Sequence, residues 1–353
     1  MTARPRGRPP LVMAGVEVKA GKSKRIELPA PNLSSGSPLS MPAEVLHGSQ
    51  EGPTIWLSGA IHGDELTGVE VIRRVLEKIR RRAIRGTIIA VPVVNVFGFI
   101  AGSRYLPDRR DLNRAFPGSD RGSLASQLAH LFMREVVSRS QYGIDLHTGA
   151  DHRTNLPQIR ADLDDAETLH LAQAFGAPII VHAVLRDGSI REAAARKGAR
   201  VLVFEGGEPH RFDEWAVTAG TSGVLRVLHA LEMVGQPEDG EAIPENAPWT
   251  LPLPGTPRVC RSTHWTRAGR SGVARLVAGL GEEVTKGQSL GFISDSFGSL
   301  RVPVRAGASG VIIGMTRNPL VNRGDAIFHI ARMDSGEESH DGEPERDGES
   351  NQR

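Results

Sequence analysis

Two histidines and one glutamate in this sequence have the types and the setting of a metal site. His62 and Glu65 are separated by two residues, and His147 lies farther along the chain, at the end of the stretch Asp145-Leu146-His147. Two imidazoles and one carboxylate are the protein ligands of a catalytic zinc ion that keeps its fourth position for water. The pattern therefore predicts one Zn²⁺ per chain, bound by His62, Glu65 and His147, and with it a metal-dependent hydrolase.

The surrounding sequence distinguishes the His-x-x-Glu spacing at residues 62–65 from the same spacing elsewhere in the chain. The same spacing recurs at residues 229–232, inside a helical pattern, and at 340–343, inside an acidic segment. Only residues 62–65 follow an apolar run typical of a buried strand, at 54–61, and precede a helical pattern, at 66–79. Open α/β sheets place their sites where strands end and helices begin. We therefore expect the ligands to meet at this edge of a sheet. The remaining histidines show no second ligand pattern.

Strand and helix patterns alternate along most of the chain. Strands are predicted at 16–18, 25–28, 43–47, 87–96, 142–147, 158–160, 179–184 and 201–204, and a further helix is predicted at 124–137. Alternation of this kind implies parallel pairing with helices on both faces of the sheet. The expected fold class is therefore α/β, with a mixed but mainly parallel sheet flanked by helices.

The sequence changes character after a proline-rich stretch at 237–257. Beyond it, Ser271-Gly-Val and Ser309-Gly-Val begin two similar series of short strands and glycine turns, which is an internal repeat. The repeat resembles the small β-sandwich of lipoyl- and biotin-carrying domains. Those domains carry a modified lysine on the hairpin between the two halves, but residues 295–301 contain no lysine. We expect the fold without the swinging cofactor.

The expected domain division follows these changes in composition. It assigns N-terminal strands to 1–50, a catalytic domain to 51–236, a linker to 237–257, a β-sandwich to 258–333 and a disordered acidic tail to 334–353. The tail holds eight acidic residues against two arginines, so the formal charge of +2 leaves a net basic body. A segment so polar cannot bury enough apolar surface to fold.

The composition also excludes several classes of protein. No apolar run approaches the length of a membrane span, and the basic start lacks the apolar core of a secretory signal. Cys260 is the one cysteine, so no internal disulfide can form and a cytoplasmic location is expected. The basic run 80–82 fits a helix end, where cations suit the dipole. No aromatic residues interleave it, so nucleic acid is not an expected partner.

Four motifs, in this order, carry a family resemblance. They lie at 59–68 (GAIHGDELTG), 111–118 (DLNRAFPG), 145–149 (DLHTG) and 204–207 (FEGG). The chain resembles the aspartoacylase/succinylglutamate desuccinylase family, which is related to zinc carboxypeptidases, and within it the bacterial deacylases of N-acyl amino acids. The resemblance implies a carboxypeptidase-like catalytic fold, and the C-terminal β domain is also similar to that of bacterial members.

The resemblance also implies a general base and two supporting carboxylates. Glu205 would take the proton of the metal-bound water and pass it to the departing amine. Glu208 is a weaker candidate for this role, because it follows two glycines in a loop. Asp111 and Asp145 would accept hydrogen bonds from the ligand imidazoles and so fix their tautomers, and Asp111 is favoured as the partner of His62.

The resemblance further implies that arginines and an asparagine in and near the second motif bind the substrate and stabilise its oxyanion. Arg104 would polarise the scissile carbonyl and stabilise the oxyanion. Because its spacing to residues 111–114 is looser than in mammalian members of the family, Arg109 or Arg110 could take its place. Asn113 and Arg114 would bind the α-carboxylate of the substrate, a planar anion that the guanidinium can hold with two hydrogen bonds.

These features together predict a zinc-dependent amidohydrolase that removes an acyl group from a small N-acyl amino acid. A carboxypeptidase-like zinc peptidase is the first alternative, because the same metal set and carboxylate clamp serve both reactions. A non-catalytic small-molecule binding protein is the second, and the joint presence of ligands, base and clamp disfavours it. The sequence does not identify the acyl group or the amino acid, and it leaves a homo-oligomer open.

Overall fold

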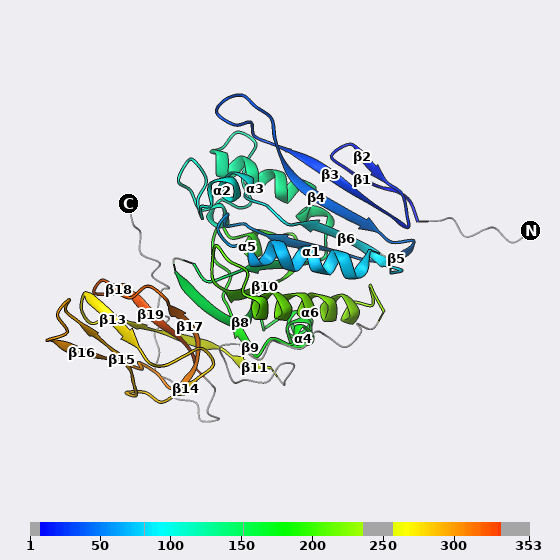
Figure 1. Ribbon diagram of the computed structural model, residues 1–353. Helices are drawn as coiled ribbons and strands as arrows, with labels where there is room; N and C mark the ends of the chain where they lie inside the picture. The colour runs from blue at the N-terminus through cyan, green and yellow to red at the C-terminus, as the bar shows by residue number, and fades with distance from the viewer. Residues whose placement is uncertain (1–7, 81, 151, 236–256, 333–353) are drawn as a thin grey trace, which may run out of the picture.

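The computed structural model describes residues 8–80, 82–150, 152–235 and 257–332. One mixed sheet of 13 strands runs through this part of the chain (Figure 1). Its centre is parallel, in the order β6-β5-β7-β10, and antiparallel strands flank it, with β4 pairing with β6 and β8 pairing with β10. The strands of this region are β3 (Lys22–Ala30), β4 (Leu39–His47), β5 (Gln50–Gly59), β6 (Arg85–Val91), β7 (Tyr142–His147), β8 (Arg153–Ala161), β9 (Ile179–His182) and β10 (Arg200–Gly207).

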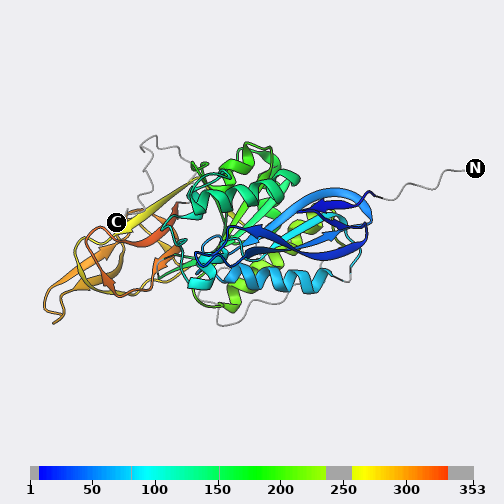
Figure 2. The same cartoon turned by 90° about the horizontal axis from the view of Figure 1, so that it is seen from above.

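Helices cover both faces of the sheet. α1 (Thr67–Ile79), α4 (Ala166–Phe175) and α6 (Glu214–Ala230) pack on one face, while α3 (Leu124–Glu135) and α5 (Ile190–Ala195) pack on the other (Figures 1 and 2). Successive side chains of a strand point to opposite faces. Accordingly Ile55 and Leu57 join the core under α1, whereas the intervening Trp56 joins the core under α3. The apolar run of β5 is buried because its side chains pack alternately into the cores on the two faces of the sheet.

Two predicted strands are shorter in the structure. The strand predicted at 87–96 ends at Val91, because Pro92 has no N–H for the ladder and Asn95 then caps α2 (Val96–Ala101) by accepting from the Gly98 N–H at 2.8 Å. The strand predicted at 179–184 ends at His182. The predicted helix at 124–137 ends at Glu135, and a 3₁₀ turn, η2 (Val137–Arg139), follows it. The alternation of strand and helix patterns implied parallel pairing for β8, but this strand pairs antiparallel with β10.

The C-terminal strands lie in two sheets, and their core also includes residues of the catalytic part, such as Leu156 of β8 and Trp215 of α6. One set extends the main sheet, because β17 pairs antiparallel with β8; it comprises β12 (Ser262–Arg267), β14 (Glu283–Val284), β17 (Gly310–Thr316) and β19 (Ala326–Arg332). The other is a separate four-stranded sheet of β13 (Gly272–Leu276), β15 (Ser289–Ser294), β16 (Arg301–Arg305) and β18 (Leu320–Val321). The view from above shows these strands gathered at one end of the molecule (Figure 2). The catalytic and C-terminal parts therefore share one hydrogen-bonded sheet.

Short elements complete the fold. β1 (Leu11–Met13) and β2 (Val16–Val18) form a hairpin, and β11 (Arg258–Cys260) pairs in parallel with β9. The predicted linker, apart from residue 257, and the predicted acidic tail at 334–353 lie outside the described residues. Among the described helices, none has the length and apolar character needed to cross a bilayer.

Candidate metal centre

A sharp turn after β5 brings His62 and Glu65 to the edge of the sheet. Ala60 adopts a left-handed φ of 46°, which is uncommon for a residue with a Cβ and redirects the chain directly after the strand. Gly63 follows, and a Cβ there would lie 2.0 Å from the Gly98 carbonyl carbon on α2. The turn is therefore pressed against α2, and only glycine fits at this position. α1 begins two residues after Glu65.

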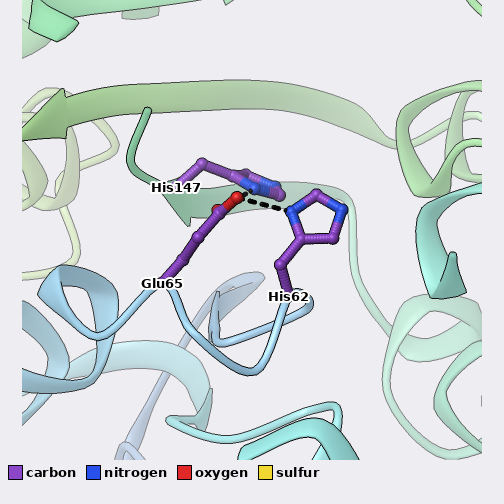
Figure 3. A group of neighbouring side chains, drawn as sticks. All are labelled: His62, Glu65 and His147. Carbon is purple, nitrogen blue, oxygen red and sulfur yellow. Dashed lines mark hydrogen bonds and ion pairs between the residues drawn. The ribbon is translucent and has the colours of Figure 1, made fainter. Parts of the chain in front are cut away.

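The three predicted ligands converge on one point. The Nδ1 atoms of His62 and His147 lie 2.7 Å from Oε1 and Oε2 of Glu65 respectively. One ligand atom from each of these residues lies within 4.8 Å of the other two, and all three side chains are buried. Figure 3 shows both imidazoles turned towards the Glu65 carboxylate. Residues that are far apart in the sequence thus form a group that could hold a metal ion.

Two more carboxylates hold the outer nitrogens of the imidazoles. Asp111 Oδ1 lies 3.1 Å from Nε2 of His62, the imidazole with which the sequence analysis pairs it. Asp145 Oδ2 lies 2.7 Å from Nε2 of His147, and its other oxygen accepts from the Ser58 hydroxyl at 2.7 Å. Carboxylates at Nε2 favour a proton there, which leaves the Nδ1 lone pairs for a cation. Borderline-soft Zn²⁺ suits such a set of two imidazoles and a carboxylate.

The pKa values of Glu65, His147 and His62 indicate which charge this group favours. Burial alone would raise the pKa of Glu65, but the imidazoles of His62 and His147 hold it well below its ordinary value. Burial lowers the pKa of His147, yet Asp145 and Glu65 outweigh it and raise that pKa well above its ordinary value. The pKa of His62 is also raised, because Glu65 and Asp111 outweigh its burial. Buried carboxylates thus favour positive charge at this point, which protons or a divalent cation can supply.

The proposed base lies beside this group. Glu205 is the register partner of His147 on the adjacent parallel strand, and Asn155 Nδ2 donates to its Oε2 at 2.7 Å. The competing Glu208 is engaged elsewhere, with ion pairs to Arg211 at 3.5 Å and to Arg317 at 3.4 Å. The structure therefore brings Glu205, rather than Glu208, into register with a candidate ligand.

One of the three candidate arginines contacts the metal-binding group. Arg104 is largely buried, and its guanidinium donates to Glu65 Oε1 at 3.3 Å and to Asp111 Oδ2 at 2.9 Å. Arg110, in contrast, is 63% exposed and lies 3.7 Å from Asp108. Arg109 has a left-handed φ of 60° and an exposed side chain. Of the three candidates, only Arg104 has the position from which an arginine could reach a carbonyl at the candidate centre.

The Asn113 and Arg114 pair lies next to Asp111 in the 3₁₀ turn η1 (Leu112–Arg114). Asp111 caps this turn by accepting from the Asn113 N–H at 2.8 Å. Asn113 Oδ1 accepts from the Ile190 N–H at 2.9 Å, which ties the turn to the start of α5. The positive charge of Arg114 helps to lower the pKa of Asp111, after the larger effects of His62 and Arg104, although burial opposes all three. The predicted clamp is therefore tied to the metal-binding group through one carboxylate.

Known proteins resemble this chain in sequence. The profile of the succinylglutamate desuccinylase/aspartoacylase catalytic domain matches residues 51–231. An N-α-acetyl-L-2,4-diaminobutyric acid deacetylase from Halomonas elongata is 32% identical over 296 residues, which make up 80% of this chain and 83% of the relative. The chain belongs to the succinylglutamate desuccinylase/aspartoacylase family. This confirms the family that the four sequence motifs indicated.

Solved structures extend the likeness in fold to the C-terminal strands. A succinylglutamate desuccinylase/aspartoacylase from Rhodobacter sphaeroides has a TM-score of 0.78 at 24% identity, and the match covers 91% of this chain and 99% of that one. The product-bound ectoine utilization protein EutE (DoeB) from Ruegeria pomeroyi has a TM-score of 0.76 at 23% identity, covering 91% and 98%. Matches of this extent include the C-terminal strands, so the mixed α/β fold and these strands are shared with such structures.

Sequence reasoning missed two neighbours of Glu205 in this family member. Asn155 and Arg160 lie on β8, which pairs antiparallel with β10, and both contact the Glu205 carboxylate. No spacing rule could have found them, because the sequence implied parallel pairing for this strand.

A second group of three candidate ligands also escaped the sequence analysis. Asp162, Asp164 and His182 lie together where β8 and β9 end. The two aspartates directly follow β8, whereas His182 ends β9, and the pairing of the two strands brings them together. Asp164 is largely exposed and already pairs with Arg261 at 2.8 Å. The group therefore fits an ordinary surface ion pair.

Proposed function

We propose that this chain is a zinc-dependent amidohydrolase that removes the acyl group from a small N-acyl amino acid. The observation that carries the proposal is the convergence of His62, Glu65 and His147 beside Glu205. A non-catalytic binding protein would not need a carboxylate in register with a metal ligand. The similarity to a diaminobutyrate derivative deacetylase supports the same class of reaction.

Each group of the candidate site would carry out a different part of the reaction. Bound zinc would supply Lewis acidity, which lowers the pKa of a coordinated water towards about 7. The Glu205 carboxylate takes a proton from the attacking water as the new C–O bond forms. It then gives that proton to the amide nitrogen, so the C–N bond breaks with a neutral amine as the leaving group. The products are the carboxylic acid of the acyl group and the free amino acid.

Positive side chains hold the substrate while this happens. Arg104 lies against the metal-binding group, where its guanidinium can stabilise negative charge on the carbonyl oxygen. Arg114, with Asn113, is proposed to bind the α-carboxylate through the planar guanidinium. Asp111 links the two functions, because it accepts from Arg104 and caps the turn that holds Asn113 and Arg114.

Three further proposals refine this assignment. The metal is proposed to be zinc, at one ion per chain, on the chemistry of the donor set. The C-terminal strands are proposed to form a lipoyl-like sandwich without a carrier lysine, since their hairpin at 295–301 has none. A cytoplasmic location is proposed because Cys260 is the only cysteine of the sequence, so no internal disulfide can form.

The first test measures amine release from a panel of N-acyl amino acids. The panel holds acetyl and succinyl derivatives of aspartate, glutamate and 2,4-diaminobutyrate, each with and without a chelator. We expect turnover of at least one derivative, loss of that turnover with the chelator, and recovery when Zn²⁺ is returned. Digestion of a peptide library in parallel tests the carboxypeptidase-like alternative. Release of C-terminal residues from peptides, without hydrolysis of any panel member, would favour that alternative instead.

A further inference from the structure

Side chains of β8 contact both oxygens of the Glu205 carboxylate, one through a hydrogen bond and the other through an ion pair. Asn155 Nδ2 donates to Oε2 at 2.7 Å, and Arg160 Nε lies 3.4 Å from Oε1. Asn155 and Arg160 sit on the strand that joins the catalytic part to the C-terminal strands, because β8 pairs with β10 on one side and with β17 on the other. Whatever fixes these two residues also fixes the orientation of the proposed base.

A glycine of the C-terminal strands leaves the space that the Asn155 amide occupies. Gly314 on β17 is the register partner of Asn155, and a Cβ at this glycine would lie 2.7 Å from Asn155 Oδ1. Real Cβ contacts are essentially never so short, so a larger residue at 314 would displace the Asn155 amide. The absent side chain of Gly314 therefore makes room for the amide that contacts Glu205.

Arg160 is fixed from the same side by a histidine. Nη2 of Arg160 lies 3.4 Å from Nδ1 of His329, a residue of β19 that is only 3% exposed. The His329 ring stacks on Trp265 of β12, with centroids 4.1 Å apart and an interplanar angle of 4°. Burial, then Arg160 and Arg153, hold the pKa of His329 well below its ordinary value. A neutral imidazole can accept a hydrogen bond from Arg160, which an imidazolium cannot.

We propose that the C-terminal strands position the proposed base indirectly, through β8: Gly314 sets Asn155 and His329 sets Arg160, and these two residues contact the two Glu205 oxygens. The proposal rests on the proposed function, in which Glu205 moves the proton. Asn155, Arg160, Gly314 and His329 are positioning residues, since they act through Glu205. The C-terminal part then contributes to turnover itself.

A double-mutant cycle between positions 155 and 314 tests the first contact. Asn155→Ala and Gly314→Ala should each lower kcat on the order of 10- to 100-fold, because a small displacement of a reacting group has that cost. KM and bound zinc should change little. In the Asn155→Ala background, Gly314→Ala should have no further effect, because the atom that it would displace is gone. Effects of the two changes that multiply in the double variant would overturn the proposal.

A matched glycine separates this contact from general damage to the C-terminal strands. Gly279 also lies in the C-terminal part, and a Cβ there would meet nothing within 4 Å. Gly279→Ala should keep wild-type kcat and unfolding temperature. A loss of kcat in Gly279→Ala as large as that in Gly314→Ala would assign the effect to folding and overturn the proposal.

Two substitutions of His329 test the second contact. His329→Asn keeps an acceptor oxygen near the place of Nδ1, whereas His329→Phe keeps a ring that can stack on Trp265 but has no acceptor. We expect kcat to fall on the order of 10-fold in His329→Phe and to be largely retained in His329→Asn. The opposite order would show that His329 acts by packing alone, and would contradict its positioning role.

A structural measurement decides the proposal without any turnover. Crystal structures of the wild type and of Gly314→Ala should show the contact between Asn155 Nδ2 and Glu205 Oε2 in the first and its loss in the second. An intact contact in Gly314→Ala would overturn the proposal even if the enzyme were active. Inactivity of the wild type on every amide would instead reject the proposed function, and the two failures are therefore distinguishable.

Discussion

His147 and Glu205 are register partners on the adjacent parallel strands β7 and β10. Register partners on parallel strands point to the same face of a sheet, so the two side chains leave the sheet together. His147 ends β7, and its imidazole faces Glu65 from the turn after β5. Three neighbouring strands therefore supply the two kinds of group that metal-assisted hydrolysis needs: the metal ligands and a carboxylate for proton transfer.

The base assignment predicts a specific defect in Glu205→Gln. The amide keeps the size of the carboxylate but cannot take a proton, so turnover should fall by roughly 10²- to 10⁴-fold while zinc remains bound. Steady-state kinetics on the best panel substrate measure kcat, and mass spectrometry of the native protein measures zinc.

Glu208→Gln is the matched control for that variant. Glu208 lies three residues on and pairs with Arg211 and Arg317, so the change should leave kcat close to the wild-type value. If Glu205→Gln turns over normally, or if Glu208→Gln is the more damaging change, Glu205 is not the base.

The ligand assignment predicts loss of the metal in His147→Ala. Two remaining ligands cannot complete the protein's share of a catalytic zinc site, so tight binding should disappear. Zinc content after dialysis, measured by mass spectrometry, should fall from one ion per chain to nearly none. His182→Ala serves as the control, because His182 belongs to the other group of potential ligands among the described residues. Equal zinc in the wild type and His147→Ala would refute the assignment.

Local sequence patterns could predict the central strands and the ligand-bearing turn. The apolar run 54–61 predicted the buried part of β5, although the strand starts at Gln50 and ends at Gly59, and the helical spacing at 66–79 predicted α1 to within one residue. The predicted element boundaries were wrong where a single residue ends an element, as at Pro92, which ends β6 after Val91. Family motifs gave the residue types of the centre, and the structure gave their convergence.

The parts of the site that the sequence did not predict depend on pairing between strands that are distant in the sequence. Asn155 contacts Glu205 only because β8 runs antiparallel to β10, and His329 contacts Arg160 only because β17 and β19 extend that sheet. No local period encodes which strand lies beside which. Residues that act across strands, such as Gly314 and His329, were therefore beyond sequence reasoning, whereas residues within one motif were not.

The carboxylate clamp predicts a substrate-dependent defect in Arg114→Ala. A guanidinium that binds the α-carboxylate contributes hydrogen bonds to a charged group, so its loss should lower kcat/KM by roughly 10- to 100-fold. The loss should be confined to substrates that carry the carboxylate. The measurement compares an N-acyl amino acid with its α-amide. Arg110→Ala is the control, since this arginine is exposed and pairs with Asp108. An equal loss on both substrates would remove the clamp from the mechanism.

An ion-pair cluster between α1 and α6 predicts how stability depends on pH. Glu70 accepts from Arg73 and Arg74 at 2.7 Å, and Arg74 also donates to Glu214 on α6 at 2.8 Å. Hydrogen bonds from Arg73, and then from Arg74, lower the pKa of Glu70 to about 2 from 4.5, against the effect of burial. A carboxyl whose pKa is lower in the folded state stabilises the fold above its unfolded pKa. That stability is lost as the pH falls from about 4.5 to about 2.

Glu70→Gln should therefore be less stable than the wild type at pH 7 by about 1–2 kcal/mol, because exposed Arg73 is screened by solvent and part of the effect is lost. The difference should shrink as the pH falls below 4.5 and should nearly vanish below pH 2, where Glu70 is protonated in both states. Urea unfolding at pH 7, 5 and 3 measures it. Glu77→Gln is the control: Glu77 pairs with Arg73 but is 70% exposed, so its loss should change stability little at any pH. A Glu70→Gln defect that stays constant down to pH 3 would show that Glu70 stabilises the helix pair through packing, because packing does not depend on the charge of the carboxyl.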